Sequence, residues 1–345
     1  MTKNINIIMG GPSAEHEVSL ATGWEMIKHI DKSKYSIRTV VVSRNKMFFY
    51  AMDDISGLSE KDLSEPEKST SFKGPLCPSN SHEIWQDCDV ALLALHGEFG
   101  EDGKIQGFLD MIGIPYTGSG VFASSVGMNK IASKDIFEKN GLLTPPGSIY
   151  YTHGKGITID EIIKKHDFPC FVKCPQSGSS RLLGRVESKK DLKNILRTFS
   201  QSSKEILIET NITGDEYSCP VLEYPDGQIR TLPPVLIKPV HSTFFDFTAK
   251  YSTGECEEIV PAPCSEELTL RIQEIALLAH TILSCRGISR TDMIVKNDKI
   301  YVLEINTLPG FTSASLAPKS FSALGGTYSE LLDILIDTAL KGVEK

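Results

Sequence analysis

The chain has 345 residues, with 36 basic and 44 acidic side chains and a formal net charge of −8 at pH 7. No stretch is basic enough for a nucleic-acid partner, and the longest apolar run, residues 90–95, is far shorter than a membrane span. The eight cysteines are scattered without a CxxC pair, and the N-terminus lacks the apolar core of a secretion signal. We therefore expect a cytoplasmic protein of two or three domains with no membrane or nucleic-acid partner.

Strand and helix patterns alternate over the first third of the chain. We expect strands at residues 4–9, 35–42 and 90–95 and a helix at 17–30, and this βαβ order predicts a parallel sheet. Residues 53–83 are polar and contain three prolines, so we expect a surface insertion that contains short elements of its own.

Two further α/β units follow. We expect helices at 121–126, 130–140 and 189–201, with strands at 170–173, 184–186 and 205–209. The last third is predicted to have a long helix at 266–285, a strand pair at 289–296 and 299–306, and a closing helix at 328–341. The predicted fold class is therefore α/β, with three units in series.

The segment VLEIN at residues 302–306 has the period of a strand. Leu303 and Ile305 are expected on one face, and Glu304 and Asn306 on the other. Carboxylate and amide oxygens are hard ligands that suit Mg²⁺ or Mn²⁺. A solvent-facing strand edge is the plain alternative.

The register of the hairpin decides whether Asp292 joins this pair. If residues 297–299 form a three-residue turn, Asp292 lies opposite Glu304 and Arg290 lies opposite Asn306. A two-residue turn would shift the register by one and send Asp292 to the other face. Metal ligands beside an arginine suit a phosphoryl group, whereas a surface ladder of charge pairs is the alternative.

Several loops carry groups that suit nucleotides. Lys173 leads into a small-residue loop whose backbone N–H groups suit phosphates, although such loops are common. Glu209 and Glu216 flank the join between two units and suit a ribose or a base edge. Residues 118–123 match the dinucleotide pattern G-x-G-x-x-A, but the acids about twenty positions later lie within a predicted helix instead of ending a strand. The P-loop pattern GxxxxGK[ST] does not occur.

Two other loops follow predicted parallel strands and open on the same edge of the sheet. One contains Glu15 and the other contains His96. Ligands of open α/β sheets bind at that edge, and an acid there suits an ammonium group. The alternatives are that Glu15 compensates a helix dipole and that His96 makes a structural hydrogen bond.

In their order along the chain, eight segments resemble the D-alanine–D-alanine ligases of the ATP-grasp superfamily. The resemblance runs from about residue 5 to 335, and its most specific parts are the opening GGPSAEHEVSL and the closing LEINTLPGFTSASL. The other segments are HGEFGEDG, YTGSGVFASSVGMNK, FVKCPQSGSS, IETNITGDEY, DFTAKY and SRTD.

The resemblance implies a three-domain ATP-grasp fold with an N-terminal substrate domain (1–120), a central domain (121–213) and a C-terminal catalytic domain (214–345). It implies that ATP phosphorylates the carboxylate of one D-alanine and that the amine of a second D-alanine attacks the acyl phosphate. The product would be D-alanyl-D-alanine for peptidoglycan synthesis. A cytoplasmic homodimer that uses ATP and two Mg²⁺ (or Mn²⁺) ions is also implied.

The matching motifs also imply roles for individual residues. Glu15 matches the residue that holds the first ammonium group, Ser179 and Tyr251 match its loop-ordering partners, and Arg290 and the Gly310 N–H match the stabilisers of the tetrahedral intermediate. His96 matches a contact to the first substrate, and Ser315 and the Leu316 N–H match the grip on the second carboxylate. The matched ATP ligands are Lys130, Lys173, Glu209, Glu216 and Lys250, and the matched metal ligands are Asp292, Glu304 and Asn306.

The sequence departs from the family pattern after Lys173. Cys174 replaces a proline, and Arg181-Leu182 stands where Val-Gly is usual, so we expect a functional enzyme with altered ATP handling. Tyr251 argues for an amino-acid acceptor, because relatives that make D-alanyl-D-lactate typically carry Phe there. Two alternatives stay open: a ligase for another amino-acid or hydroxy-acid acceptor, and a nucleotide-binding relative that has lost catalysis.

Overall fold

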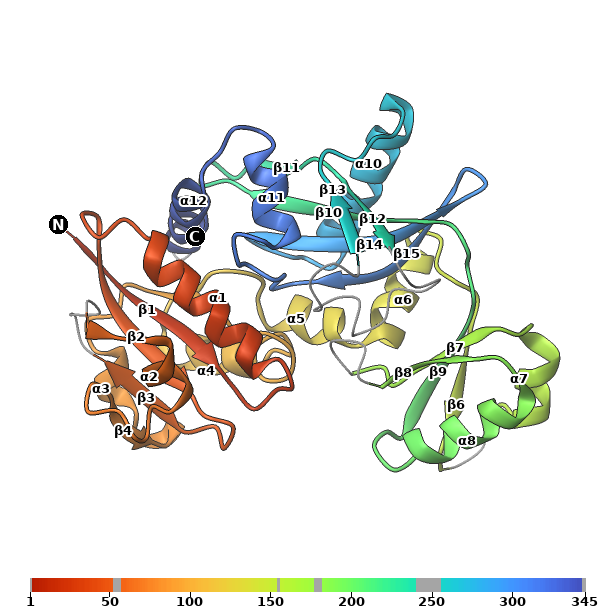
Figure 1. The fold of residues 1–345 in the computed structure, drawn as a ribbon, viewed down its shortest axis with the longest axis horizontal. Helices are drawn as coiled ribbons and strands as arrows, with labels where there is room; N and C mark the ends of the chain where they lie inside the picture. The colour runs from red at the N-terminus through yellow and green to blue at the C-terminus, as the bar shows by residue number, and fades with distance from the viewer. Residues whose placement is uncertain (1, 52–56, 154–155, 177–181, 240–255, 343–345) are drawn as a thin grey trace.

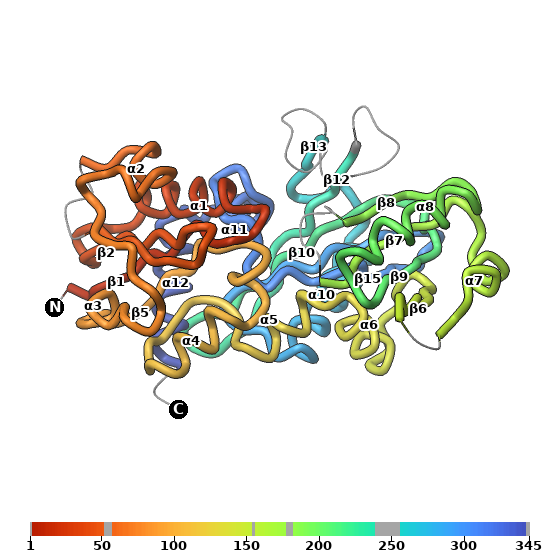
Figure 2. Tube along the Cα trace, turned by 90° about the horizontal axis from the view of Figure 1, so that it is seen from below, coloured from red at the N-terminus to blue at the C-terminus, as the bar shows by residue number. Residues whose placement is uncertain are grey.

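The computed structural model describes residues 2–51, 57–153, 156–176, 182–239 and 256–342. These residues form three β-sheets (Figure 1). The N-terminal sheet lies at one end of the molecule and the sheet of residues 147–210 at the other, with the sheet of residues 215–306 between them (Figure 2). Named by their order along the chain, the sheet of residues 147–210 is the central sheet and the sheet of residues 215–306 is the C-terminal sheet.

The N-terminal sheet has the strand order β4-β3-β2-β1-β5. Strand β1 (Lys3–Gly10) is parallel to both β2 (Tyr35–Val42) and β5 (Val90–Leu93), as the βαβ pattern predicts. These strands are almost wholly buried, which fits their apolar sequences, because parallel sheets are covered on both faces. The remaining elements are β3 (Phe48–Ala51), β4 (Lys73–Leu76), α1 (His16–His29), α2 (Glu60–Ser64), η2 (Pro78–Asn80), α3 (His82–Trp85) and α4 (Lys104–Ile112).

The central sheet is antiparallel, with the strand order β6-β9-β7-β8. Helix α8 presents Leu192, Leu196 and Phe199 at helical spacing, and these side chains are buried in the core of the sheet. The elements are β6 (Gly147–Tyr151), α7 (Ile159–Lys165), β7 (Cys170–Lys173), β8 (Leu183–Val186), α8 (Lys189–Phe199) and β9 (Glu205–Thr210).

The C-terminal sheet is also antiparallel, with the order β13-β12-β10-β14-β15 and β11 paired to β10. Its strands are β10 (Asp215–Glu223), β11 (Ile229–Thr231), β12 (Val235–Pro239), β13 (Cys256–Ile259), β14 (Ile288–Lys296) and β15 (Lys299–Asn306). Its later helices are α10 (Glu266–Ile282), α11 (Leu316–Ser322) and α12 (Tyr328–Lys341).

Helices connect the three sheets. Helices α5 (Val121–Met128) and α6 (Lys130–Lys139) place Ala123 and Phe137 in the apolar core of the C-terminal sheet. Helix α12 lies beside the N-terminal sheet (Figure 1), and its Leu335 shares a core with Ile7 of β1. Helix α12, near the C-terminus, and the N-terminal sheet are therefore held against each other by a common apolar core.

The hairpin of β14 and β15 has the shorter of the two turns that the sequence left open. Lys296 pairs with Lys299, so the turn has two residues, and its Asn297 and Asp298 have φ values of 47° and 60°. This turn alone would place Asp292 out of register with Glu304, but the register shifts by one between Asp292 and Met293. As a result Asp292 lies opposite Glu304, which is the pairing expected for a three-residue turn, reached here through a two-residue turn and a register shift.

The register shift also changes which residues of β15 face the core. Val302 and Ile305 are 1% and 3% exposed and belong to the core of the C-terminal sheet, whereas Leu303 is only partly buried. The prediction that Leu303 shares a face with Ile305 is therefore wrong. One extra residue in the strand explains the change, because it breaks the alternation between the two faces.

Most other predicted elements are confirmed to within a few residues, and several were missed. The part of the predicted insertion that the structure describes, residues 57–83, contains short elements as expected. This segment is more buried than predicted, because β4 joins the N-terminal sheet and the side chains of Leu63 and Phe72 are buried. No helix among the described residues is long and apolar enough to cross a membrane. The elements missed are β3, α4, β6, α7, β10 to β13 and α11.

Candidate active site

Asp292 lies at the centre of a polar face on the hairpin. Arg290 donates hydrogen bonds from Nε and Nη2 to its two carboxylate oxygens, each at 2.9 Å. Ser218 Oγ donates at 2.6 Å from the neighbouring strand β10, and Asn306 Nδ2 donates at 3.2 Å from β15. With Glu304 opposite, these residues form what we call the hairpin face. Because donors approach both oxygens, the orientation of the Asp292 carboxylate is fixed.

Glu304 connects the hairpin face to helix α6. Its Oε2 lies 2.9 Å from Nζ of Lys130, and the two side chains are 22% and 15% exposed. Lys130 is the first residue of α6, which begins after the cap residue Asn129 and packs on β15. The backbone N–H of Lys130 donates to the carbonyl of Pro175 at 3.1 Å, so this lysine also contacts the loop after β7.

A second lysine–carboxylate cluster lies at the central sheet. Glu209 of β9 is buried, with Lys173 Nζ at 2.6 Å and Lys134 Nζ at 3.0 Å. Burial raises the pKa of Glu209, but the two ammonium groups outweigh it, so the pKa is lowered and the carboxylate is ionised. Lys134 Nζ also donates to Thr144 Oγ1 at 2.6 Å and to the Pro145 carbonyl.

Glu216 lies near the start of β10, directly after the chain leaves the central sheet. Its neighbour across the ladder is Ile294 of β14. The two predicted nucleotide carboxylates, Glu209 and Glu216, are therefore at the end of one sheet and the beginning of the next.

Glu15 is positioned at the start of α1, beside the loop after β5. It is the N-cap residue of the helix, and its N–H donates to Ser13 Oγ at 3.1 Å. Ser13 Oγ in turn donates to the carbonyl of His96 at 2.7 Å. Gly97 has a φ of +69°, and a Cβ at that position would collide with Glu15 Oε2. The glycine thus allows the second loop to approach the Glu15 carboxylate closely.

His96 is buried and has a partner on each ring nitrogen. Nδ1 lies 3.1 Å from the carbonyl of Leu308, which can only accept, so Nδ1 carries the proton. Nε2 then accepts from Thr22 Oγ1 at 2.9 Å. Burial lowers the pKa of His96 although the carboxylate of Glu15 opposes this effect, so the ring is neutral at pH 7.

Glu101 completes what we call the Glu15 pocket, which consists of Glu15, His96 and Glu101. It accepts a hydrogen bond from the N–H of Gly97 at 2.7 Å and another from the N–H of Leu308 at 3.2 Å. Burial, followed by the nearby charge of Glu15, raises the pKa of Glu101 to about 8. The Leu308 contacts join this pocket to the segment after β15, more than 200 residues away.

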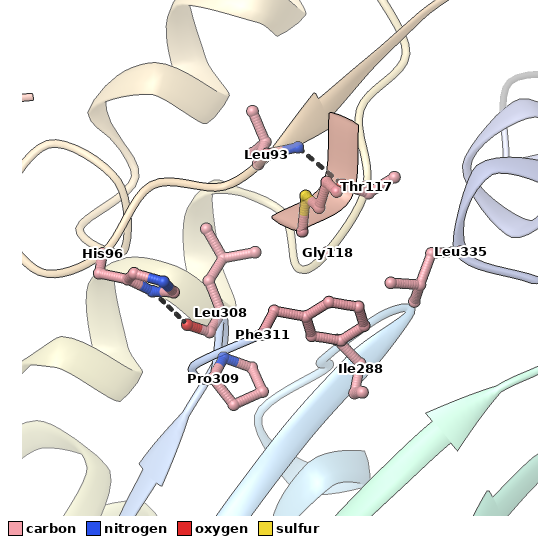
Figure 3. Close-up of a pocket in the computed structure, with 10 residues that line it drawn as sticks. Leu93, His96, Thr117, Gly118, Ile288, Leu308, Pro309, Phe311 and Leu335 are labelled. Carbon is pink, nitrogen blue, oxygen red and sulfur yellow. Dashed lines mark hydrogen bonds between the residues drawn. The ribbon is translucent and has the colours of Figure 1, made fainter. Parts of the chain in front are cut away.

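A pocket lined mainly by apolar groups lies next to His96 (Figure 3). The close-up shows Leu93 and Gly118 on one side and Phe311 and Leu335 on the other, with the His96–Leu308 hydrogen bond at its edge. It is therefore formed where the N-terminal and C-terminal parts of the chain meet.

The segment from 309 to 315, here called the 309–315 loop, brings Gly310 and Ser315 together. A Cβ built on Gly310 would lie 3.2 Å from Ser315 Oγ. Thr312 donates its N–H to Ser315 Oγ at 3.1 Å, and Leu316 begins helix α11 directly afterwards. Gly310, predicted to stabilise the tetrahedral intermediate, thus lies close to Ser315 and Leu316, which were predicted to hold the second substrate's carboxylate.

The structure brings together Arg290, Asp292, Asn306, Glu304 and Lys130 in one cluster, and Lys173 and Glu209 in another. Ser179, Lys250 and Tyr251 lie outside the residues that the structure describes.

Three participants were not predicted: Glu101, Lys134 and Ser218. Lys134 follows Lys130 by four residues, so helical spacing could have placed both lysines on one side of α6. Glu101 lies in the same glycine-rich loop as His96, but no pattern in the surrounding sequence indicates its contact with Leu308. Ser218 faces Asp292 only through the β10–β14 register, which a sequence does not reveal.

Two family models match the chain. The model described as D-ala D-ala ligase N-terminus matches residues 4–119, and the model described as D-ala D-ala ligase C-terminus matches residues 150–337.

Curated relatives and solved structures match over nearly the full length. The D-alanine–D-alanine ligase of Leptospira interrogans is 35% identical over 98% of each chain, and the D-alanine–D-alanine ligase A of Bacillus cereus is 39% identical over 97% of each. The crystal structure of a D-alanine–D-alanine ligase from Bacillus anthracis complexed with ATP has a TM-score of 0.76 and 33% identity over 99% of each chain. The VanG D-Ala:D-Ser ligase of Enterococcus faecalis has a TM-score of 0.86 and 28% identity, covering 98% of this chain and 100% of its own.

Proposed function

The chain belongs to the D-alanine–D-alanine ligase family, and we propose that it joins two D-alanine molecules into D-alanyl-D-alanine with ATP as phosphoryl donor. Its fold is the predicted α/β ATP-grasp fold. The observation that carries the proposal is the hairpin face, where Arg290 and Asp292 lie close to Lys130 and Glu304. The dipeptide is a precursor for peptidoglycan synthesis.

In the first step, an oxygen of the donor carboxylate attacks the γ-phosphorus of ATP, and the bond to the ADP oxygen breaks. Lys130 and Lys173 contribute positive charge to the phosphates. Both ammonium groups are already held in place by carboxylates, Lys130 by Glu304 and Lys173 by Glu209. The two positive charges are therefore in position before ATP binds. When ATP binds, each ammonium group needs only to exchange its carboxylate oxygen for a phosphate oxygen or to contact both.

In the second step, the amine of the acceptor attacks the acyl carbon, and the tetrahedral intermediate collapses with loss of phosphate. The oxyanion is stabilised by the guanidinium of Arg290 and the N–H of Gly310. Asp292 orients that guanidinium through two hydrogen bonds and is itself held by Ser218 and Asn306. Neutralising Asp292 would therefore disturb the group that meets the developing charge.

The donor D-alanine is proposed to bind in the Glu15 pocket. The carboxylate of Glu15 pairs with the donor ammonium, next to the neutral His96. Glu101 of the same pocket is held by the N–H groups of Gly97 and Leu308. The roles that the resemblance gives to Ser179, Lys250 and Tyr251 remain predictions, as does the division at residues 120 and 213.

Two Mg²⁺ or Mn²⁺ ions are proposed to bind to Asp292, Glu304 and Asn306. Among the described residues, no group of three or more His, Cys, Asp or Glu side chains is arranged to hold a metal ion, but this set consists of two carboxylates and an amide. Its oxygens fit a hard cation, and the hairpin register places Asp292 opposite Glu304. Bound metal ions would neutralise charge on the phosphates. Removal of metal with EDTA should abolish ADP release, and Mg²⁺ should restore it.

Altered ATP handling is proposed for the loop after Lys173. Cys174 is buried, and its N–H donates to the carbonyl of Leu182 at 3.0 Å, while the Leu182 side chain packs on the same core. Residues 177–181 lie outside the described residues. Replacing Arg181-Leu182 by Val-Gly should change the KM for ATP, and an unchanged KM would contradict the proposal.

A cytoplasmic homodimer is the assembly that the resemblance supports. Sedimentation equilibrium of the purified chain should give twice the mass of 38.0 kDa. A mass equal to that of one chain across micromolar concentrations would contradict it.

The proposed reaction is tested by product identification. The purified chain is incubated with Mg-ATP and D-alanine, L-alanine, D-alanine plus D-serine, or D-alanine plus D-lactate, and products are identified by mass. We expect ADP, phosphate and D-alanyl-D-alanine whenever D-alanine is present. Tight ATP binding without ADP release in any mixture would instead indicate a relative that has lost catalysis.

A further inference from the structure

The 309–315 loop is fixed at one peptide group by a residue outside the loop. The hydroxyl of Tyr328, the first residue of α12, donates to the carbonyl of Phe311. The same peptide group has Thr312 at its other side, and the Thr312 N–H donates to Ser315 Oγ at 3.1 Å. Tyr328 and Ser315 therefore hold the two ends of a single peptide plane.

The Ser315 hydroxyl is turned toward the interior of the loop. Ser315 occupies the N-cap position of α11, yet its side chain makes no cap hydrogen bond. Its Oγ instead lies 3.0 Å from Thr312 Oγ1 and close to Gly310. When Thr312 supplies protons from both its N–H and its hydroxyl, the Ser315 proton is left to donate to a carboxylate.

Tyr328 is itself held rigidly. Its ring centroid lies 5.0 Å from that of His29 in α1 and 5.7 Å from that of Phe311. Burial, followed by the charge of Glu25, raises the pKa of Tyr328, so its hydroxyl remains a donor across the physiological range. Helix α12 begins with a capping box, which fixes the position of its first residue.

Helix α1 contacts Tyr328 through His29, whose ring centroid lies 5.0 Å from that of Tyr328. Glu15 occupies the N-cap position at the other end of the same helix. Helix α1 thus links the proposed donor pocket to the loop that we assign to the acceptor.

We infer that Tyr328 is a positioning residue for the acceptor amino acid. It acts through the Phe311–Thr312 peptide on Ser315 and not by contact with substrate. The inference rests on the proposed function, because it assigns Ser315 to the acceptor carboxylate. It predicts that loss of the Tyr328 hydroxyl loosens the acceptor while leaving donor phosphorylation unchanged.

A loosely held acceptor has a chemical consequence. If the amine attacks late, water attacks the acyl carbon, the bond to the phosphate oxygen breaks, and D-alanine and inorganic phosphate are released. One ATP is then converted to ADP and phosphate without a dipeptide. The ratio of ADP to dipeptide, which is one in full coupling, therefore reports acceptor positioning and is insensitive to a uniform loss of active protein.

The test uses Tyr328→Phe, which removes the hydroxyl and keeps the ring. Tyr224→Phe is the matched control, because Tyr224 packs against the same core and its ring stacks with Arg230. Saturation curves for D-alanine give separate KM values for donor and acceptor. For Tyr328→Phe we expect the acceptor KM to rise about fivefold, a size typical of one lost hydrogen bond. The donor KM and the ATP KM should change less than about twofold, and the ADP-to-dipeptide ratio should exceed one.

An unchanged acceptor KM with a ratio of one in Tyr328→Phe would overturn the inference. A parallel rise of all three KM values with a lower melting temperature would also overturn it, because that pattern indicates a structural role. Thr312→Val, which removes the hydroxyl that lies 3.0 Å from Ser315 Oγ, should shift the acceptor KM in the same direction and serves if Tyr328→Phe does not fold. Failure of the wild-type chain to form dipeptide would instead contradict the proposed function.

Discussion

The hairpin face and the Glu15 pocket are built in opposite ways. Arg290, Asp292 and Asn306 lie within 16 positions of one another, and their arrangement follows from one hairpin and its register. The Glu15 pocket instead joins three segments, and its contact between Glu101 and Leu308 spans 207 positions. Backbone pairing between adjacent strands determines the geometry of the hairpin face, whereas the Glu15 pocket depends on how distant helices and strands pack together. Substitutions should therefore affect chemistry in the first and chemistry together with stability in the second.

The largest effect is expected at the centre of the hairpin face. Asp292→Asn keeps the size of the side chain but removes the charge that orients Arg290. We expect kcat for ADP release to fall about 10²–10³-fold, as for other losses of a charge-stabilising group. Asp298→Asn, in the exposed turn of the same hairpin, is the control and should leave kcat unchanged. Activity of Asp292→Asn within tenfold of wild type would show that the hairpin face is not the reaction centre.

Lys134 offers the next test, because it joins α6 to the central sheet. Lys134→Met leaves Glu209 with only one ammonium partner and frees the Thr144–Pro145 segment. We expect the KM for ATP to rise about tenfold, with a lower melting temperature, since one partner of a buried ion pair is lost. Lys139→Met alters an exposed lysine on the same helix and is the control. Equal KM values for the two variants would rule out a role of Lys134 in ATP binding.

Glu101 makes the stability of the Glu15 pocket depend on pH. Its pKa in the folded protein is raised to about 8, above the unfolded value, so folding favours the protonated form. This contribution to stability is fully present below the unfolded pKa and is lost as the pH rises through about 8. Between pH 6 and 9 the free energy of unfolding of wild type should fall by about 1–3 kcal/mol relative to Glu101→Gln. Chemical denaturation of both proteins measures this difference, and parallel pH curves would contradict the assignment.

The smallest effect is expected at the turn of the hairpin. Asp298 has a φ of 60°, a left-handed conformation that glycine adopts without strain. Asp298→Gly should raise the free energy of unfolding by about 0.5 kcal/mol and leave kcat unchanged. Urea denaturation provides the measurement. A decrease in stability would mean that the Asp298 side chain contributes more than its backbone strain costs.

The sequence predicted much of the hairpin and little of the Glu15 pocket. Alternation located both strands, and Asp292 pairs with Glu304 as expected for a three-residue turn, although a two-residue turn and a register shift produce this pairing. That shift was not predictable, because Val302 and Leu303 are both apolar and either fits the core. Pro220 within β10 hid a central strand, since proline argues against one. Glycines with positive φ at both ends of α4, Gly103 and Gly113, likewise obscured a helix.

The βαβ pattern placed Glu15 and His96 at one edge of the sheet, where an acid suits an ammonium group, and the family resemblance assigned both residues to the first substrate. Their proximity depends on Ser13, which bridges the two loops, and on Gly97, which leaves space for the Glu15 carboxylate. Such contacts depend on how β1 and β5 pair, which a local pattern does not encode.

In the proposed reaction, a D-alanine carboxylate is phosphorylated and then joined to a second D-alanine. The most direct measurement uses D-alanine labelled with ¹⁸O in both carboxylate oxygens, with Mg-ATP, and analyses the dipeptide and the phosphate by mass. We expect D-alanyl-D-alanine and one ¹⁸O atom in each phosphate, because the donor oxygen that attacks the γ-phosphorus leaves with the phosphate. Unlabelled phosphate, or ADP release without dipeptide in the wild-type chain, would contradict it.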